Sequence, residues 1–312
     1  MELPHLRSLL FAPGSDARKL EKAFGSAADG VVCDLEDAVA PHDKERARDV
    51  TAAALAAVAR PAVSDPAPHP GRGVVPPPTR PSVPANSAPG GDDSVPISTQ
   101  PSWPARFVRV NAVGTAWFED DLALTRTLTL DGIVLPKASP EAVDALGLEG
   151  PAVVAIVETA SGLRQAFEIA SRPRVAALLL GSVDLGAEVG LETRADGQEI
   201  LYARSKITFD SAAAGLRGPF DVVHLDFEDA AGLETQCRLA RSLGFRGKAC
   251  IHPAQLETIN RIFTPSEGEI EWARGVIDAF ESQSEGVLAV NGTMVDRPVV
   301  ERARRILQEA GT

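Results

Sequence analysis

The chain has 312 residues, 44% of them hydrophobic, and a formal net charge of −12 with a pI near 5.0. This composition is enough for a large core, and its acidity argues against nucleic-acid binding, which needs a basic surface. No stretch approaches the roughly 18 continuous apolar residues of a membrane span, and the N-terminal sequence is wrongly flanked for a signal peptide. Three separated cysteines provide no zinc or disulfide framework and suit a reducing compartment. We therefore expect a cytoplasmic protein that binds neither nucleic acid nor membrane.

Eight short apolar runs alternate with helical patterns along the chain, and each run ends in, or just before, a polar or charged residue. The predicted strands comprise residues 7–11, 30–34, 106–111, 132–136, 152–157, 175–181, 220–225 and 248–251. Alternating strands and helices with chemistry at the strand ends predict an α/β fold, a (βα)8 TIM barrel. The active site of such a barrel lies at the carboxyl ends of its strands.

Helix ends are marked by residues with a preference for them. Ser15 or Asp16 is placed to cap the first helix, and Ser139 to cap the helix that follows it. Gly244 is typical of the residue that stops a helix, and Pro265 is expected to open the second of two helices after the eighth strand.

Residues 61–104 differ from the rest because they hold 13 of the 24 prolines and lack apolar periodicity. We expect a disordered or polyproline-like insertion before the third strand, with VPPPTRP as one possible docking motif. It enters on the amino-terminal side of the barrel, so it should leave the active site intact.

The C-terminal tail has its own pattern. Two apolar runs flank Asn291-Gly292, a strong hairpin signal, and a helix with Pro298 in its first turn follows. We interpret residues 1–286 as the barrel domain and 287–312 as an arm or lid that packs on a neighbouring subunit.

The barrel layout gathers chemical groups from distant parts of the sequence at one rim. These are Glu36, Arg109, Lys137, Glu158, Asp184, Asp226 and His252. Two carboxylates on adjacent strands suit Mg²⁺, which prefers oxygen ligands and retains several waters. In the structural alternative, Asp184 caps a helix and Glu158 pairs with a basic residue. The spacing alone favours neither this alternative nor the metal site.

Arg109 lies within an apolar strand, where a charge requires an anionic partner. It pairs structurally with Glu36 or Asp37, or binds a substrate carboxylate. Lys137 is either a Schiff-base lysine or, more simply, a salt-bridge residue.

Nine ordered blocks extend this interpretation: RSLLFAPGSDARKLEKA, VVCDLEDAV, FVRVNAVGTAWFEDDL, GIVLPK, AIVETASGL, GSVDLGAEVG, YARSKI, GKACIHPAQL and GTMVDRPVVERAR. Together they resemble the citrate lyase beta-subunit-like family, CoA-ester lyases of the HpcH/HpaI aldolase superfamily. The resemblance covers nearly the whole chain except residues 61–104, which are not part of the family pattern. It implies a (βα)8 barrel, Mg²⁺ dependence and a homotrimer or hexamer.

The resemblance also implies roles at matching positions. Glu158 and Asp184 match the metal ligands, and Arg109 matches the arginine that binds keto-acid and thioester oxygens. Asp296 matches a catalytic aspartate that the C-terminal arm carries to a neighbouring subunit, while Glu36 is one open choice for the base. Positions that match CoA contacts are Phe11, Arg18, Lys22, Lys44, Arg48, Ile251 and His252.

The expected function is Mg²⁺-dependent cleavage of a 3-hydroxyacyl-CoA thioester, of malyl-CoA or citramalyl-CoA type, into acetyl-CoA and a 2-keto acid. Alternatives on the same scaffold are a malyl-CoA thioesterase or malate synthase, or the beta subunit of a citrate lyase complex acting on a carrier-bound citryl group. A non-catalytic scaffold barrel is a further alternative.

Overall fold

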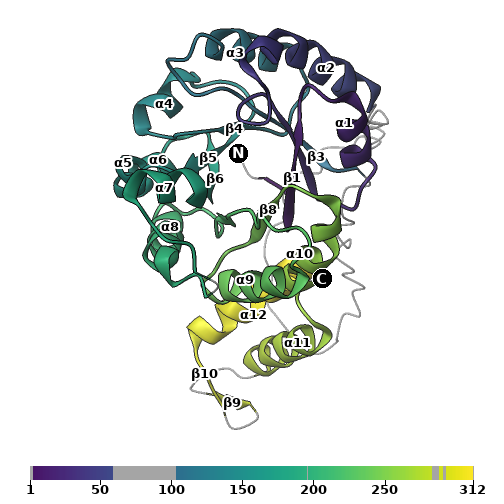
Figure 1. Ribbon diagram of the computed structural model, residues 1–312. Helices are drawn as coiled ribbons and strands as arrows, with labels where there is room; N and C mark the ends of the chain where they lie inside the picture. Colours follow the sequence, from purple (N-terminus) through teal and green to yellow (C-terminus); the bar gives the residue numbers. More distant parts are fainter. Residues whose placement is uncertain (1–2, 59–102, 195, 283–287, 291–292, 312) are drawn as a thin grey trace, which may run out of the picture.

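The computed structural model describes residues 3–58, 103–194, 196–282, 288–290 and 293–311 (Figure 1). Eight parallel strands form a closed barrel in which each strand pairs with the next and the last pairs with the first. They are β1 (Ser8–Pro13), β2 (Gly30–Asp34), β3 (Ala105–Arg109), β4 (Gly132–Leu135), β5 (Ala152–Val157), β6 (Val175–Leu180), β7 (Phe220–Asp221) and β8 (Gly247–Cys250). The predicted TIM barrel is confirmed.

Helices connect the strands and form a ring outside them (Figure 1). They are α1 (Ala17–Phe24), α2 (Lys44–Ala57), α3 (Phe118–Thr127), α4 (Pro140–Ala145), α5 (Ala160–Arg164), α6 (Ala166–Ala170), α7 (Ser182–Val189), α8 (Leu201–Ala213), α9 (Ala230–Ser242) and α10 (Leu256–Phe263). Three short 3₁₀ helices, η1 (Pro41–Asp43), η2 (Gln198–Ile200) and η3 (Pro253–Gln255), complete the loops.

Alternation along the strands divides the core into two layers. On β2, Val32 faces the barrel interior with Phe107 and Phe220. Its neighbours Val31 and Cys33 face the helices. Each strand therefore fills the barrel with one face and anchors the helical ring with the other, which leaves the strand ends free for chemistry.

Most of the predicted helix ends agree with the structure. Asp16 rather than Ser15 caps α1 by accepting from the Lys19 amide at 3.1 Å, and Ser139 caps α4. Gly244 follows α9 with a φ of 95°, where the left-handed backbone favours glycine. The helix α11 (Glu267–Glu281) is capped by Ser266, one residue beyond the predicted proline.

Two elements differ from their predictions by more than a shift of one or two residues at an end. The helix expected after the fifth strand is divided into α5 and α6 at Gln165, whose backbone leaves helical geometry. The seventh strand ends at Asp221, although the apolar pattern predicts it to extend to residue 225. Asp221 is fully buried and accepts from Arg204 at 2.9 Å and Lys248 at 2.6 Å. This ion-pair triad ties the short strand to α8 and β8.

The C-terminal segment forms a hairpin and a helix, as expected. Strands β9 (Leu288–Val290) and β10 (Thr293–Val295) are antiparallel, and α12 (Arg297–Ala310) packs against α11. The two helices share a cluster, built around Ala273, Val276 and Ala303, that is separate from the barrel core. Figure 1 shows the hairpin projecting beyond α11, away from the barrel.

Some predictions lie outside the described residues. These are the disordered or polyproline-like conformation predicted for residues 61–104, of which 61–102 are not described, and the turn at Asn291-Gly292. Within the described residues, no helix combines the length and the apolarity needed to cross a membrane.

Candidate active site

A pocket of about 210 Å³ lies at the carboxyl ends of the barrel strands. Its lining residues come from the ends of β1, β3, β5, β6 and β8, from the segments after β2 and β7, and from the first turn of the helix after β6. Those with polar or charged side chains are Asp37, Arg109, Glu158, Ser182 and Asp184. The barrel thus brings Arg109, Glu158 and Asp184, predicted from distant sequence positions, into one pocket.

Arg109 ends β3 inside a ring of carboxylates. Strand register sets Asp34 directly opposite it, and Asp34 accepts a bidentate pair of hydrogen bonds at 2.7 and 2.6 Å. The guanidinium also lies 3.0 Å from Glu36 and 3.2 Å from Asp37. Burial disfavours its charge, but the hydrogen bond and charge of Asp34 outweigh this and raise the Arg109 pKa above its ordinary value. The cation therefore persists, and the ring of Phe11 lies 5.4 Å from it.

Glu36 is buried beside this cation and is only 7% exposed. Burial raises its pKa to about 8, although Arg109 opposes the shift. Arg109 contacts Oε2 of Glu36, and the ammonium of Lys137 lies 3.9 Å from Oε1 of the same carboxyl group. A carboxyl that titrates near neutral pH is suited to proton transfer.

Glu158, 5% exposed, lies at the end of β5. Its Oε1 accepts from the Lys137 amide at 2.7 Å, rather than from a basic side chain. Burial raises the Glu158 pKa to about 7; the Lys137 amide opposes that shift and the nearby Asp184 charge adds to it. Asp184 lies in the first turn of α7, whose N-cap is Gly181 without a side-chain cap. The capping alternative for Asp184 is therefore not what the structure contains.

The residues around Glu158 fit a divalent cation. A Cβ at Gly181 would come within 2.5 Å of the Glu158 Cβ and 2.6 Å of its Oε2, so the glycine keeps this position open. The Asp184 charge raises the pKa of Glu158, and a cation bound by the two carboxylates would relieve this repulsion. Within the described part of the chain, no group of three or more His, Cys, Asp or Glu side chains is arranged as a complete metal site. Two carboxylates that leave places for water and substrate suit Mg²⁺.

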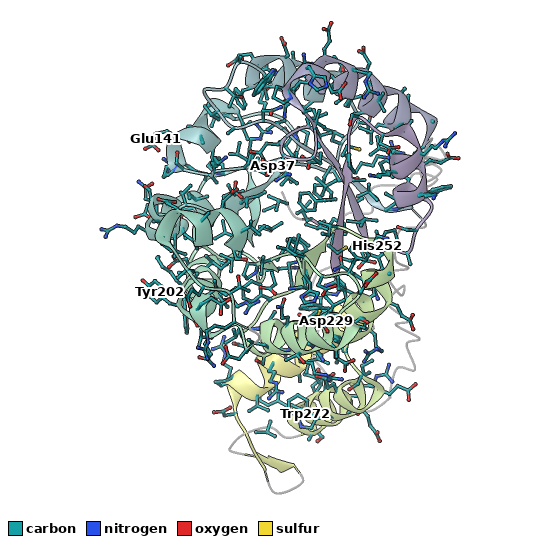
Figure 2. The ribbon with its side chains drawn as sticks, in the orientation of Figure 1. Asp37, Glu141, Tyr202, Asp229, His252 and Trp272 are labelled. Carbon is teal, nitrogen blue, oxygen red and sulfur yellow. The ribbon has the colours of Figure 1, made fainter. Side chains whose placement is uncertain are left out.

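The residues predicted to contact CoA are distributed unevenly. Phe11 and Ile251 line the pocket, and Arg18 and Lys22 are exposed on α1. His252 is exposed, stacks on Phe227 with ring centroids 4.8 Å apart, and is labelled in Figure 2.

Two of the predicted CoA contacts are occupied within the protein. The Lys44 ammonium is buried and donates to the Leu35 carbonyl, the Glu36 carbonyl and Asn111, each at 2.7 Å. Arg48 pairs with Asp120 and Asp121 on α3. The three protons of the Lys44 ammonium are thus all donated within the protein, and none is left for a ligand.

Asp296 lies apart from the pocket. It is exposed and caps α12 by accepting from the Val299 amide at 3.3 Å. Asp226 is also exposed and lines a neighbouring hollow of about 620 Å³ between α7, α8 and the loop after β7.

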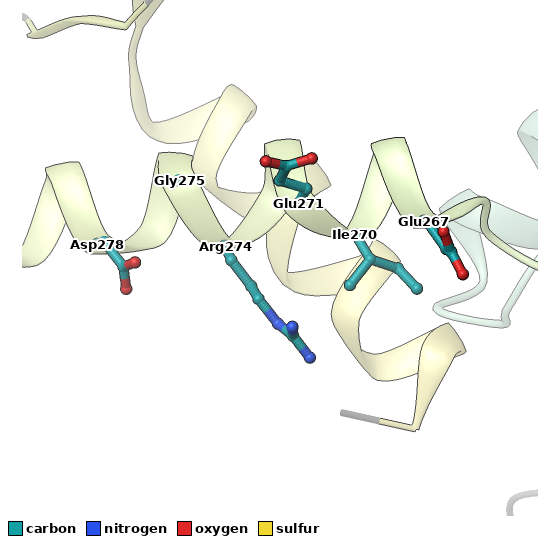
Figure 3. A pocket seen from close by; sticks show the side chains of 6 residues that line it. All are labelled: Glu267, Ile270, Glu271, Arg274, Gly275 and Asp278. Carbon is teal, nitrogen blue, oxygen red and sulfur yellow. The ribbon is translucent and has the colours of Figure 1, made fainter.

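A separate hollow lies along α11, where a single helix supplies all the lining residues (Figure 3). They are Glu267, Ile270, Glu271, Arg274, Gly275 and Asp278. Trp272, labelled in Figure 2, belongs to this same helix outside the barrel. Convergent side chains from several elements distinguish the barrel pocket from this surface.

Sequence reasoning missed Asp34 as the main partner of Arg109, and it missed the Lys137 amide. Asp34 is the last residue of the apolar strand that leads into DLED, and the register of β2 against β3, which the sequence alone does not give, places it opposite Arg109. No side-chain pattern reveals an amide hydrogen bond.

Fold and pocket together define a TIM barrel that carries a carboxylate pair and an arginine at the carboxyl ends of its strands. The chain matches the family described as HpcH/HpaI aldolase/citrate lyase over residues 7–66 and 97–253, and it belongs to this family. The interval that the match leaves out, 67–96, falls within the proline-rich segment.

Named relatives extend the match over almost the full chain. A (3S)-malyl-CoA thioesterase of Cereibacter sphaeroides is 35% identical over 97% of this chain and 94% of its own length. The citrate lyase subunit beta of Leuconostoc mesenteroides is 31% identical over 97% of this chain and 93% of its own. The CitE protein of Mycobacterium tuberculosis, solved with magnesium, acetoacetate and coenzyme A, is 31% identical, covers 99% of both chains and superposes with a TM-score of 0.73.

Proposed function

We propose that this protein is a Mg²⁺-dependent carbon–carbon lyase that cleaves a malyl-CoA or citramalyl-CoA type thioester into acetyl-CoA and a 2-keto acid. The observation that carries the proposal is the pocket in which Arg109 lies with Glu158 and Asp184. The related CitE protein, which binds magnesium, a keto acid and coenzyme A, supports the same ligand set. The substrate would place its hydroxy-acid end in the barrel and its CoA arm across Phe11 and Ile251.

Glu158 and Asp184 would hold the metal. When bound, Mg²⁺ supplies a Lewis acid for the hydroxyl and carboxylate oxygens of the substrate. Glu36 would accept the hydroxyl proton, because its pKa near 8 matches neutral solution. Arg109 would stabilise the negative charge that develops on the thioester oxygen as the bond between the carbons breaks.

Asp296 would protonate the resulting enolate from the arm of a neighbouring subunit. It lies on the projecting C-terminal segment and does not line the pocket of its own chain. With the subunit number that the family resemblance implies, the proposed assembly is a homotrimer or hexamer in which each arm completes the next site.

A second candidate is hydrolysis of the malyl-CoA thioester, favoured by the 35% identity to malyl-CoA thioesterases. The same pocket would bind the same substrate, with water attacking the thioester carbonyl. The citrate lyase relative favours a third candidate, action on a carrier-bound citryl group.

Product analysis separates these functions. The purified protein is incubated with malyl-CoA or citramalyl-CoA, with MgCl₂ or with EDTA, and the products are identified by mass spectrometry. The lyase predicts magnesium-dependent acetyl-CoA with glyoxylate from malyl-CoA or pyruvate from citramalyl-CoA. Free CoA with intact hydroxy acid would establish the thioesterase, and no turnover of either would favour the carrier-dependent subunit.

A further inference from the structure

Lys137 has an unusual backbone for a residue with a side chain. Among the described residues it is the one non-glycine with a positive φ, 46°. Left-handed backbone is strained when a Cβ is present, and residues strained in this way cluster at functional sites. The residue follows Pro136 directly after β4, at the rim that carries the pocket.

Two hydrogen bonds hold this turn against the end of β5. The Lys137 amide donates to Glu158 Oε1 at 2.7 Å, and the next amide, of Ala138, donates to the Ile156 carbonyl at 3.0 Å. The turn therefore lies across β5, and its first amide is directed at the Glu158 side chain.

We propose that Lys137 is a positioning residue whose strained backbone amide fixes Glu158 for metal binding. With Oε1 held by that amide, the second oxygen lies against Gly181, at the junction that leads to Asp184. A hydrogen bond from the outer shell orients a carboxylate ligand and removes its rotational freedom. This inference rests on the magnesium site of the proposed function.

The lysine side chain has a separate place in the pocket. Its ammonium is half-exposed and lies 3.9 Å from Glu36 Oε1. Glycine would adopt the same φ without strain, so backbone geometry alone does not require a lysine. The amide and the ammonium can accordingly be tested apart.

The test compares Lys137→Gly, Lys137→Asn and Lys137→Val by calorimetric titration with MgCl₂. Glycine and asparagine tolerate positive φ and retain the amide, so we expect a Kd for Mg²⁺ within about twofold of the unaltered protein. Valine resists positive φ, and we expect about tenfold weaker binding, typical of a lost outer-shell contact. Thermal unfolding checks that each variant is folded, and Lys137→Thr, which is also β-branched, replaces the valine variant if that one does not fold.

Three outcomes would overturn the inference. Equal Mg²⁺ affinity in the valine variant would show that the backbone does not position Glu158. Equal loss in the glycine, asparagine and valine variants would transfer the effect to the ammonium. Absence of Mg²⁺ binding by the unaltered protein would remove the metal site altogether. Because the titration needs no turnover, Mg²⁺ binding without conversion of either thioester would sink the proposed reaction and leave this inference standing.

Discussion

Arg109 carries its positive charge at the end of a buried strand because three carboxylates surround it. The bidentate pair with Asp34 uses Nε and Nη2 along one edge of the guanidinium and leaves Nη1 directed to Glu36 and Asp37. A planar fork of this kind cannot be replaced by an ammonium. The arrangement fixes a cation at the pocket without allowing it to rotate.

Arg109→Lys tests this geometry. A lysine would keep the charge but could not bond Asp34 bidentately while facing the pocket, so we expect kcat to fall about 100-fold, in the range for a lost oxyanion donor. Steady-state kinetics with the thioester identified by product analysis measures the effect. Arg172→Lys is the matched control, since Arg172 also bonds one carboxylate bidentately, that of Asp144, but outside the pocket. Equal effects of the two changes, or none, would contradict the role of Arg109.

Glu36 and Glu158 share a raised pKa, to about 8 and about 7, because both are buried. The folded protein therefore retains protons that the unfolded chain has released, and stability falls as pH rises from about 4.5 through 8. We expect metal-free protein to lose at most about 8 kcal/mol over this interval from these groups, at about 1.4 kcal/mol for each unit of pKa difference. Mg²⁺ binds the ionised form of Glu158, so the stabilisation of the folded protein by Mg²⁺ should increase with pH.

Thermal unfolding at about pH 5 and about pH 8, with and without MgCl₂, measures both effects. Glu158→Gln isolates the contribution of one carboxyl, because the amide cannot ionise, and it should flatten the pH dependence. A magnesium effect that is the same at both pH values would argue that Glu158 does not titrate in this range.

For individual residues, the sequence predicts which side chains lie together in the pocket better than it predicts their hydrogen-bond partners. Arg109, Glu158 and Asp184 follow predictable strands, so barrel closure alone brings them together. The partner of Arg109 depends on register between β2 and β3, which a single sequence does not reveal. The sequence does not reveal that Lys44, predicted to contact CoA, is buried, because its acceptors are mostly backbone carbonyls.

Elements with regular apolar patterns agree best with prediction. Strands β2 and β5 have the predicted bounds, since each is a fully buried run. Strand β7 is shorter than its apolar pattern because its hydrogen bonding is limited to Phe220 and Asp221. The residues after it instead line the two hollows at the rim.

The triad at β7 has a testable energetic role. Attraction by Lys248 and Arg204 outweighs burial and holds the Asp221 pKa below its ordinary value. Asp221→Asn would leave two buried cations without their anion, and we expect a loss of about 3–5 kcal/mol in the free energy of unfolding. Chemical denaturation near neutral pH measures it. Asp144→Asn, which breaks an exposed pair, is the control and should cost less than about 1 kcal/mol. Similar losses for the two variants would show that the triad adds no special stability.

The whole molecule separates its proposed catalytic groups. Glu158, Asp184 and Arg109 lie at the rim of the barrel. Asp296 caps α12, which packs on α11 outside the barrel. The covalent chain does not bring these groups together within one subunit as described. A neighbouring subunit could supply the Asp296 carboxyl, because a closed ring of identical subunits repeats the same contact at every site.

Mixing two inactive variants tests this arrangement. Asp296→Asn retains the barrel groups and lacks the acid, whereas Glu158→Gln lacks a metal ligand and retains the acid. If the arm acts on the next subunit, co-expression restores about a quarter of the activity, since a random ring pairs an intact barrel with an intact arm in one site of four. If the arm acts on its own barrel, every chain lacks one group and the mixture stays inactive. Separately purified variants, mixed only in the assay, control for slow subunit exchange, and size-exclusion chromatography with light scattering confirms that mixed rings form.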